Sequence, residues 1–355
     1  MSLKKSSDRP TLRDVARVAG VGTTTVSRVI NGGERVAPEM LAQVRAVMAE
    51  LGYQPNQAAR ALKSARSKVI GLIVPSIADP FFAQFASVAE QVAREHDYAM
   101  ILLTSMDRAE RGTLDLKILE RHRVDGLLLV PPRTGSKALL QQLDQISVPI
   151  VAFDRPLIGR NCSRVLCDNF NAAATAMQHL VDHGRRRILV LGGDPRLHTI
   201  QQRLQGCLKV VASAGLDEIV DMDAAAYDVA EAAILRRTKQ KGGIDAIFGL
   251  YNQATIRAYE VLQNHNIAMP KCISLIGFDD FALASTLRPS ITVVSQPVGE
   301  MARSATHLLL QHMSGEVSSV RHVEIGASMV IRQSCGVHAI AKAGRAGLLP
   351  GAANF

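Results

Sequence analysis

Signals that start and stop helices follow one another so closely over residues 11–52 that this stretch has room for three short helices only. Thr11 and Asp14 have the spacing of a capping box, in which the side chain of each accepts a hydrogen bond from the backbone N–H of the other. Gly20 and Gly22 then break the first helix, and a turn that contains Gly is typical of a helix-turn-helix. The apolar residues of this first helix recur at helical spacing, at Leu12, Val15, Ala16 and Ala19.

A second and a third helix are predicted from the same signals. The second ends at residues 31–33, Asn-Gly-Gly, because Gly readily adopts the left-handed conformation that closes a helix. Pro38 suits the first position of the third helix, and Gly52 ends it. The predicted buried residues of the two helices are Val26, Val29, Ile30, Leu41, Val44, Met48 and Leu51.

The outward face of the second helix is polar. In a helix-turn-helix, side chains near the N-terminus of the second helix contact base edges. Thr can bond a base through its hydroxyl and pack its methyl group on thymine, whereas Arg bonds guanine or a phosphate. The pattern favours DNA binding, and the alternative is a small three-helix bundle with a solvated polar face. The outward residues are Thr23, Thr24, Thr25, Ser27 and Arg28.

Positive charge is concentrated in the same part of the chain. Residues 1–68 contain 12 Lys or Arg against five Asp or Glu, so they carry +7 of the total of +9, and the other 287 residues carry only +2. A basic module joined to a near-neutral body is the electrostatic footprint of nucleic-acid binding. We therefore expect this part to bind a polyanion with a steep salt dependence.

The segments TLRDVARVAGV, TTVSRVINGG and ELGYQPNQAARALKS resemble the DNA-binding head of the LacI/GalR family of bacterial transcription regulators. The resemblance implies that Thr23 and Thr24 read bases. It also implies that a hinge helix follows Tyr53 and that Leu62 enters the minor groove as an apolar wedge, which kinks the duplex. The predicted DNA-contacting set is Thr11, Thr23, Thr24, Thr25, Ser27, Arg28, Asn31, Tyr53, Asn56, Arg60, Leu62 and Lys63.

The chain departs from the family pattern at two helix starts. Gly22 stands where a Ser N-cap is usual, and Ala37 stands where Ser or Thr is usual. Gly can cap a helix but has no side chain to meet a phosphate, and Ala offers no capping oxygen. Both departures are expected to loosen the head without removing a base contact.

After Lys68, short apolar runs alternate with helical segments. Continuous apolar strands between helices predict parallel sheets that helices cover on both faces. The rhythm restarts after the fourth run, so we expect two doubly wound lobes, with ligand bound beyond the carboxyl ends of the strands. The runs span residues 69–74, 98–103, 124–130, 148–153, 164–167, 187–193, 219–223, 244–251 and 272–278.

Polar and aromatic residues at these strand ends are the candidate ligand contacts. Polar groups that converge on a cleft are the default hypothesis for a ligand site. The alternative is that they are helix caps and loop charges, since Asp at a strand-to-helix turn is often a cap. The predicted effector-binding set is Asp79, Phe81, Asp154, Arg155, Arg203, Asn252 and Asp279.

Residues 68–333 resemble the sensor domain of the same family, which is similar to periplasmic sugar-binding proteins. Asn252 matches the Asn of the family's usual Asn-Asp pair, but Gln253 departs from it. The motifs that carry the resemblance are DPFF at 79–82, FDRP at 153–156, R-x-x-G from Arg203 and GFDD at 277–280.

The fold implied is a helix-turn-helix domain joined by a hinge helix to a two-lobed α/β sensor of the type I periplasmic-binding-protein kind. The N-lobe is expected to span 69–163 and 293–320, and the C-lobe 164–290 and 321–335. The remaining expected segments are a flexible N-terminus at 1–9, the head at 10–52, the hinge at 53–68 and a flexible tail at 336–355.

The carboxylates and the amide of the effector-binding set suit a sugar, because they bond hydroxyl groups. Arg203 can hold a hydroxyl or, through two parallel hydrogen bonds, a carboxylate or phosphate. If Arg133 or Arg155 also faces the cleft, a sugar acid or phosphorylated sugar becomes the better ligand. The sequence therefore predicts a sugar or sugar-acid effector.

The sequence contains no signature of several other classes of protein. It has no apolar run of about 18 residues and no secretory h-region, so we expect a cytoplasmic protein without a membrane span. Cysteine spacing predicts no metal site, and His179 and His183 lack the Glu between them that H-E-x-x-H requires. Phosphate-loop, dinucleotide and nucleophile-elbow motifs are missing too, so we expect no catalytic residue and no cofactor. The alternatives are a transport-type sugar-binding protein and a Rossmann-like sugar enzyme.

The resemblance also implies partners. Two protomers pair as a homodimer, and their heads bind a pseudo-palindromic operator in double-stranded DNA, because the operator mirrors the symmetry of the protein. Effector and operator affinities are then coupled reciprocally, typically by ~1–3 kcal/mol. No leucine heptads follow His338, so no tetramer-forming coiled coil is expected.

Overall fold

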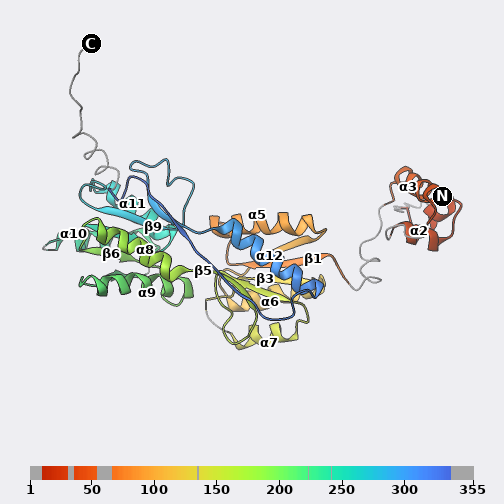
Figure 1. The fold of residues 1–355 in the computed structure, drawn as a ribbon, viewed down its shortest axis with the longest axis horizontal. Helices are drawn as coiled ribbons and strands as arrows, with labels where there is room; N and C mark the ends of the chain where they lie inside the picture. Colours follow the sequence, from red (N-terminus) through yellow and green to blue (C-terminus); the bar gives the residue numbers. More distant parts are fainter. Residues whose placement is uncertain are drawn as a thin grey trace, which may run out of the picture. The chain divides into compact units, whose positions relative to one another are not determined.

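The chain forms two units in the computed structural model, Met1–Lys68 and Val69–Phe355 (Figure 1). The structure describes residues 10–30, 36–53, 66–133, 136–222, 224–240 and 242–336. The expected N-terminal segment at 1–9, most of the hinge, and the tail from residue 337 onward lie outside these ranges.

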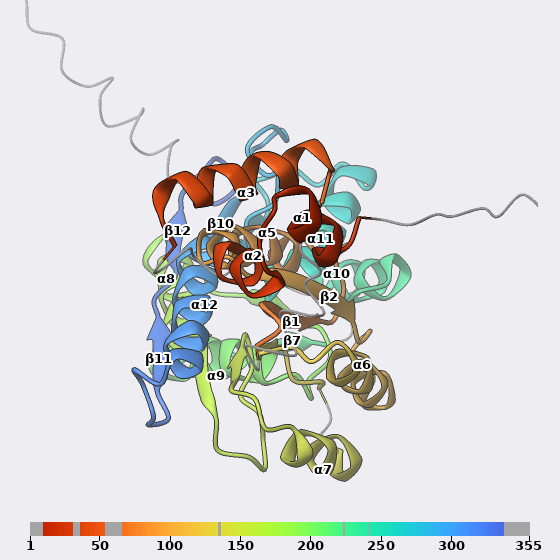
Figure 2. The same ribbon diagram turned by 90° about the vertical axis from the view of Figure 1, so that its right-hand side faces the viewer.

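The first unit is a small helical bundle, and Figure 2 shows its three helices together. The predicted capping box is present: Thr11 Oγ1 accepts from Asp14 N at 3.3 Å, and Asp14 Oδ2 accepts from Thr11 N at 3.0 Å. Gly20 has a φ of 65°, a left-handed conformation that Gly adopts without strain, and it turns the chain towards the second helix. The helices are α1 (Leu12–Val18), α2 (Thr23–Ile30) and α3 (Pro38–Glu50).

The core of this bundle is made of the apolar residues that the helical periodicity predicts. Val15, Val26 and Val44 are fully buried, one from each helix. Ala16, Ala19 and Val29 complete the buried cluster. The predicted helix-turn-helix is therefore confirmed.

The first lobe of the second unit is built on a six-stranded sheet in the order β11-β5-β4-β3-β1-β2, with all neighbours parallel. The central strands β1, β3 and β4 are buried because helices cover both faces of the sheet, whereas the edge strands β2 and β11 are partly exposed. The strands are β1 (Val69–Val74), β2 (Ala99–Thr104), β3 (Gly126–Leu129), β4 (Ile150–Phe153), β5 (Ser163–Cys167) and β11 (His322–Ile325).

Helices α5 and α12 pack on one face of this sheet, and α6 and α7 pack on the other (Figure 1). Phe85 of α5 stacks on Phe153 of β4 with ring centres 3.7 Å apart, and this contact ties the first face to the sheet. The helices are α5 (Pro80–Glu95), α6 (Ala109–Arg121), α7 (Lys137–Gln145) and α12 (Val298–Ser314).

The second lobe repeats this plan with a six-stranded sheet in the order β12-β10-β9-β8-β6-β7. Its edge strand β12 runs antiparallel to β10, and the other pairs are parallel. The strands are β6 (Ile188–Leu191), β7 (Ile219–Asp221), β8 (Ala246–Gly249), β9 (Ser274–Phe278), β10 (Thr292–Ser295) and β12 (Ser328–Val330).

Two helices cover each face of the second sheet as well. Helices α8 and α9 share one core cluster, and α10 and α11 share the other. The helices are α8 (Asn169–Asp182), α9 (His198–Ser213), α10 (Tyr227–Lys239) and α11 (Asn252–Asn264). The predicted fold class, a helix-turn-helix domain with a two-lobed α/β sensor, is confirmed.

The lobe boundaries expected from sequence need correction. The segment 164–167 was assigned to the second lobe, but β5 pairs with β4 in the first sheet. The segment 293–295 was assigned to the first lobe, but β10 pairs with β9 in the second sheet. The third crossing lies between β11 and β12 rather than at residue 321. An apolar run predicts a buried strand but does not reveal its neighbour, which only pairing decides.

Among the described residues, no helix has both the length and the apolar character that a membrane crossing requires.

Candidate functional site

Helix α2 presents the predicted reading face of the head. Thr23, Thr24 and Arg28 are exposed, and Thr25 and Ser27 are half-buried. The buried Val26 and Val29 on the opposite side hold the helix against the bundle. The exposed side therefore offers hydroxyls, methyl groups and one guanidinium to a partner.

Two further predicted DNA contacts have structural roles in the head. The Thr11 hydroxyl donates to Asp14 Oδ2 at 2.6 Å, so the capping box already engages it. Tyr53 is half-buried against the head core, and its N–H donates to Met48 O at 2.9 Å. Ala37 caps α3 without a side-chain hydrogen bond, as its residue type requires. The predicted contacts that lie outside the described residues are Asn31, Asn56, Arg60, Leu62 and Lys63.

In the second unit, the structure brings together the predicted effector-binding residues that carry polar groups. Asp154 follows β4 in the first lobe, and Asp279 follows β9 in the second, so the two Asp residues hold equivalent positions. Their φ angles of 66° and 71° are both left-handed, and the N–H of each donates to the neighbouring strand. Asp79 caps α5, and Asn252 begins α11. All four therefore lie in the segments that follow strands, and Asp79 and Asn252 also mark the starts of helices.

Arg203 is the best-connected residue of the site. Its buried guanidinium donates from Nη1 to Asp279 Oδ2 at 3.2 Å and from Nε to Asn169 Oδ1 at 2.7 Å. Nη1 also donates to the Leu250 carbonyl at 2.8 Å, and the guanidinium lies 3.7 Å from the ring centre of Phe278. Planar guanidinium groups suit such combined hydrogen bonding and stacking. The orientation of Arg203 is therefore fixed before a ligand arrives.

Gly206, one turn after Arg203, explains why the R-x-x-G motif contains Gly. A Cβ at this position would collide with the backbone carbonyl of Phe170 in α8. The missing side chain lets α8 and α9 approach closely, and that approach places Arg203 beside Asn169.

Two hydrogen bonds extend the cluster. Gln296 Nε2 donates to Asp279 Oδ1 at 2.5 Å, so both carboxylate oxygens of Asp279 are engaged. Asn252 Nδ2 donates to Asp79 Oδ1 at 3.5 Å, a long contact that joins the second lobe to the first. Asp79 Oδ1 also accepts from Phe81 N at 3.0 Å. The Phe81 ring is buried in the core of the first lobe, so packing accounts for this residue.

Arg155 is buried and fully engaged by its neighbours. Its Nε donates to Asp154 Oδ2 at 3.1 Å, and its Nη1 donates to Asp107 Oδ1 at 2.6 Å and to Pro131 O at 3.2 Å. Arg133 is paired as well: its Nη1 lies 2.6 Å from Asp194 Oδ2 of the other lobe. Arg155 is therefore neutralised by two protein carboxylates, whereas Arg133 shares the carboxylate of Asp194 with Arg196.

Burial disfavours the charged form of two carboxylates in the cluster. The pKa of Asp79 is raised above its ordinary value of 3.8, first by burial and then by the charge of Asp279. The pKa of Asp154 is also raised by burial, although Arg155 and Arg203 act in the opposite direction. The site therefore contains two carboxylates whose charged form is destabilised by burial and would be stabilised by hydrogen bonds from a ligand.

Sequence reasoning missed three residues that shape this cluster. Asn169 fixes Arg203, Gln296 fixes Asp279, and Asp107 fixes Arg155. Asn169 and Gln296 each lie beside a segment where the chain crosses between the lobes, and this position could have marked them. The lobe boundaries expected from the sequence placed these crossings elsewhere. Asp107, with a left-handed φ of 55°, lies in the turn after β2, and no motif marks it. Within the described part of the chain, no three His, Cys, Asp or Glu residues are grouped to hold a metal ion.

A cluster of carboxylates and amides drawn from two α/β lobes, combined with a separate helix-turn-helix head, defines a ligand-responsive DNA-binding protein. The pattern of bacterial regulatory proteins of the lacI family matches residues 11–56, and that of the periplasmic binding protein-like domain matches residues 177–335. The chain belongs to the lacI family and is a DNA-binding transcription regulator.

Relatives match almost the whole chain. The ribose operon repressor of Haemophilus influenzae is 30% identical over 327 residues, which cover 91% of this chain and 98% of that protein. The transcriptional regulator CelR of Thermobifida fusca is 32% identical over 336 residues, with 92% and 98% covered. These relatives are transcription regulators.

Solved structures show the same architecture. A complex of the transcriptional regulator CelR with cellobiose has a TM-score of 0.69 at 30% identity and covers 92% of this chain and 100% of that one. The lac repressor dimer bound to operator has a TM-score of 0.83 at 23% identity, with 92% and 99% covered, and this likeness concerns the fold alone.

Proposed function

We propose that the protein is a homodimeric repressor whose affinity for a pseudo-palindromic operator is set by a neutral sugar bound in the cleft between its lobes. The observation that carries the proposal is the fixed cluster of Arg203, Asp279 and Gln296. Asn252, also in the second lobe, donates a hydrogen bond to Asp79 of the first lobe. A preordered donor beside several carboxylate acceptors suits a ligand with many hydroxyl groups.

The chemistry of the cluster supports a polyol in particular. Each sugar hydroxyl is both a donor and an acceptor, so it can bond a carboxylate and a guanidinium at once. Asp79 belongs to the first lobe and Asp279 to the second, so one ligand bonded to both would link the lobes. The named functions of the relatives, a ribose operon repressor and a regulator bound to cellobiose, agree with a sugar.

The charge balance favours a neutral sugar over the sugar acid. Arg155 would have argued for an acid if it faced the cleft unpaired, but Asp107 and Asp154 engage it, and Arg133 pairs with Asp194 rather than with a residue of the cluster. A ligand carboxylate would also approach Asp79 and Asp279, and like charges at short range oppose binding. Arg203 is the cation that contacts Asp279 in the cluster, and its Nη1 already donates to Asp279 Oδ2 instead of to a ligand.

The exposed Thr23, Thr24 and Arg28 of α2 are the proposed base and phosphate contacts. Two copies of the head would read two half-sites of the operator. Asn31, Asn56, Arg60, Leu62 and Lys63 complete the proposed contacts, and Thr11, Thr25, Ser27 and Tyr53 support the reading helix. As a regulator of bacterial transcription, the protein is assigned to the cytoplasm and is not an enzyme.

Selection of bound fragments from genomic DNA, sequenced after washing at about physiological salt, tests the operator half of the proposal. We expect a shared pseudo-palindrome upstream of a few genes. Calorimetry against a panel of neutral pentoses, hexoses and disaccharides and their acid forms then tests the effector half. A neutral sugar that binds and changes operator affinity supports the proposal, whereas binding of the acids alone contradicts the neutral class.

A further inference from the structure

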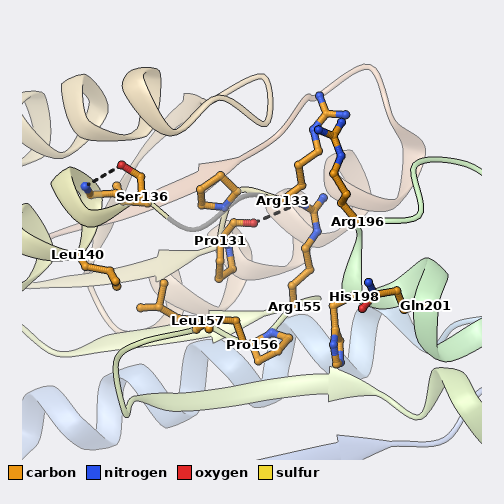
Figure 3. Close-up of a pocket in the computed structure, with 13 residues that line it drawn as sticks. Pro131, Arg133, Ser136, Leu140, Arg155, Pro156, Leu157, Arg196, His198 and Gln201 are labelled. Carbon is orange, nitrogen blue, oxygen red and sulfur yellow. Dashed lines mark hydrogen bonds between the residues drawn. The ribbon is translucent and has the colours of Figure 1, made fainter.

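A cavity of about 160 Å³ lies between the two lobes, beside the effector cluster but distinct from it (Figure 3). Of the predicted effector-binding residues, only Arg155 lines this cavity. The carboxylates of the cluster are not among its lining residues, so the cavity differs in chemistry from the sugar site.

The walls of the cavity come from both lobes. The first lobe contributes the chain after β3, the start of α7 and the chain after β4, including Pro131, Leu140 and Leu157. The second lobe contributes His198 and Gln201 from the first turns of α9. A molecule in this cavity therefore contacts both lobes at once.

The charged residues that line the cavity are all cationic. They are Arg133, Arg155 and Arg196, and no Asp or Glu is present among the described residues of the lining. Figure 3 shows the three arginine side chains reaching towards the same end of the cavity. That end is therefore suited to a negative charge.

Carboxylates behind the lining hold these arginines in place. Asp194 Oδ2 lies 2.6 Å from Arg133 Nη1 and 2.7 Å from Arg196 Nη2, so one acidic group orients guanidiniums from both lobes. The hydrogen bonds from Arg196 and Arg133 hold the pKa of Asp194 well below its usual range, so it stays charged. Asp107 fixes Arg155 in the same way. Preordered guanidiniums lose little entropy when they bind a ligand.

The other end of the cavity is apolar. Leu139, Leu140, Leu157 and Pro156 line it, and Ile158 at its rim is 69% exposed. A dry apolar cavity of about 150 Å³ accommodates a benzene molecule. The whole cavity, at about 160 Å³, therefore has room for one compact ring, whose body would lie at the apolar end.

His198 adds a polar group to the cavity that can bond a ligand oxygen. Its ring is half-buried and has no hydrogen-bond partner among the described residues. Burial, together with the nearby charge of Arg164, lowers the pKa of His198 and so favours the neutral imidazole. A neutral imidazole can donate from one nitrogen and accept at the other.

We propose that this cavity is a second ligand site, which takes a small organic acid with one carboxylate on a compact apolar body. The carboxylate lies at Arg133 and Arg196, and the body lies against Leu140 and Leu157. Because the walls come from both lobes, a bound acid favours the interlobe arrangement in which Arg133 and Asp194 are paired. The site requires neither a sugar in the cleft nor the proposed sugar class.

Benzoate is the probe, and isothermal titration calorimetry of the full-length protein is the measurement. Its neutral isostere benzamide has the same ring and nearly the same shape, so the pair isolates the contribution of the charge. We expect benzoate to bind and benzamide to bind at least about tenfold more weakly, because hydrogen bonds between charged groups are roughly twice as strong as neutral ones. Arg133→Gln should weaken benzoate binding by a similar factor.

Two variants serve as controls. Arg237→Gln removes a guanidinium that pairs with Asp221 in the second lobe and does not line the cavity, so it should leave benzoate binding unchanged. Asp279→Asn alters the sugar site and should also leave benzoate binding unchanged, which separates failure of this inference from failure of the proposed function. The inference is overturned if benzoate does not bind at about 10 mM, if benzamide binds equally well, or if Asp279→Asn abolishes benzoate binding while Arg133→Gln does not.

Discussion

The guanidinium of Arg203 donates to the carboxylate of Asp279 at 3.2 Å while it lies 3.7 Å above the ring of Phe278, the residue before Asp279. Helix α9 is thereby tied to the carboxyl end of β9 inside the second lobe. A ligand that bonds Asp279 meets a carboxylate whose position is already fixed, so little conformational entropy is lost on binding.

Replacing Asp279 with Asn should weaken binding of the sugar effector by at least about tenfold, because charge-assisted hydrogen bonds are roughly twice as strong as neutral ones. Titration calorimetry with the sugar identified from the panel measures the loss. Asp280→Asn is the matched control, since Asp280 pairs with Arg332 at 2.7 Å instead of joining the cluster. Equal losses in the two variants would contradict the assignment of Asp279.

Replacing Arg203 with Lys keeps the charge but removes the planar fork that bonds Asn169, Leu250 and Asp279 together. We expect a loss of effector affinity of about tenfold or more, because Arg and Lys are not interchangeable at such sites. Arg257→Lys, which changes a surface ion pair with Glu260, should bind sugar normally. Full effector affinity in Arg203→Lys would show that charge alone suffices.

The raised pKa of Asp79 predicts a pH-dependent stability difference between the wild type and Asp79→Asn. Above the raised pKa, the folded wild type carries a buried charge that costs free energy. As the pH falls through that pKa, the folded state takes up a proton before the unfolded state does, and the wild type gains stability relative to the variant.

Urea denaturation of both proteins, from about pH 4 to about pH 7, measures this difference. Asn can keep the N-cap hydrogen bond to Phe81 N, so loss of the cap does not confound the comparison. A difference in the free energy of unfolding that stays constant across this range would show that Asp79 titrates normally.

Ala37→Ser should stabilise the head, because Ala37 caps α3 with no side-chain hydrogen bond. A Ser oxygen at this position can accept from the first turn, and replacing Ala with a capping residue contributes about 1 kcal/mol. Hydrogen exchange of head amides in the full-length protein measures the gain. Thr11→Ala, which removes the capping box of α1, should lower protection by a similar amount. Unchanged protection in Ala37→Ser would mean that α3 does not limit opening of the head.

Arg28→Gln should reduce the salt dependence of operator binding, because Arg28 is an exposed cation on the reading helix. Loss of one phosphate contact lowers the slope of log affinity against log salt by about 1. Fluorescence anisotropy over a series of salt concentrations measures the slope. Arg237→Gln, a charge change of the same size in the sensor, should leave the slope unaltered. A slope that falls equally in both variants would point to net charge rather than a local contact.

Much of the fold could be predicted from the sequence because its signals are local. The capping box at Thr11 and the turn at Gly20 depend on residues a few positions apart, and both appear as predicted. The alternation of apolar runs and helical segments likewise predicted the two lobes. The lobe boundaries were wrong, because β5 and β10 look like any other buried strand until their partners are known.

The residues of the candidate site could likewise be predicted from the sequence only in part. Asp154 and Asp279 could be predicted because the carboxyl ends of parallel strands converge on a common edge. The roles of Asn169 and Gln296 could not, because each depends on a partner distant in sequence, Arg203 in one case and Asp279 in the other. The sequence also leaves open whether the ligand is neutral or acidic, because it does not show whether Arg133 or Arg155 faces the cleft.

The basic helix-turn-helix head, the two-lobed α/β plan and the family could be predicted without a structure, because periodicity, capping and motif spacing depend on residues close together in the chain. The folded structure was needed to show that Asp194 and Asp107 engage Arg133 and Arg155, and that Asn252 contacts Asp79 across the lobes. It was also needed to show the arginine-lined cavity beside the cluster. Charge compensation and cavities depend on distances between residues far apart in the chain, and such distances exist only once the lobes have folded and packed.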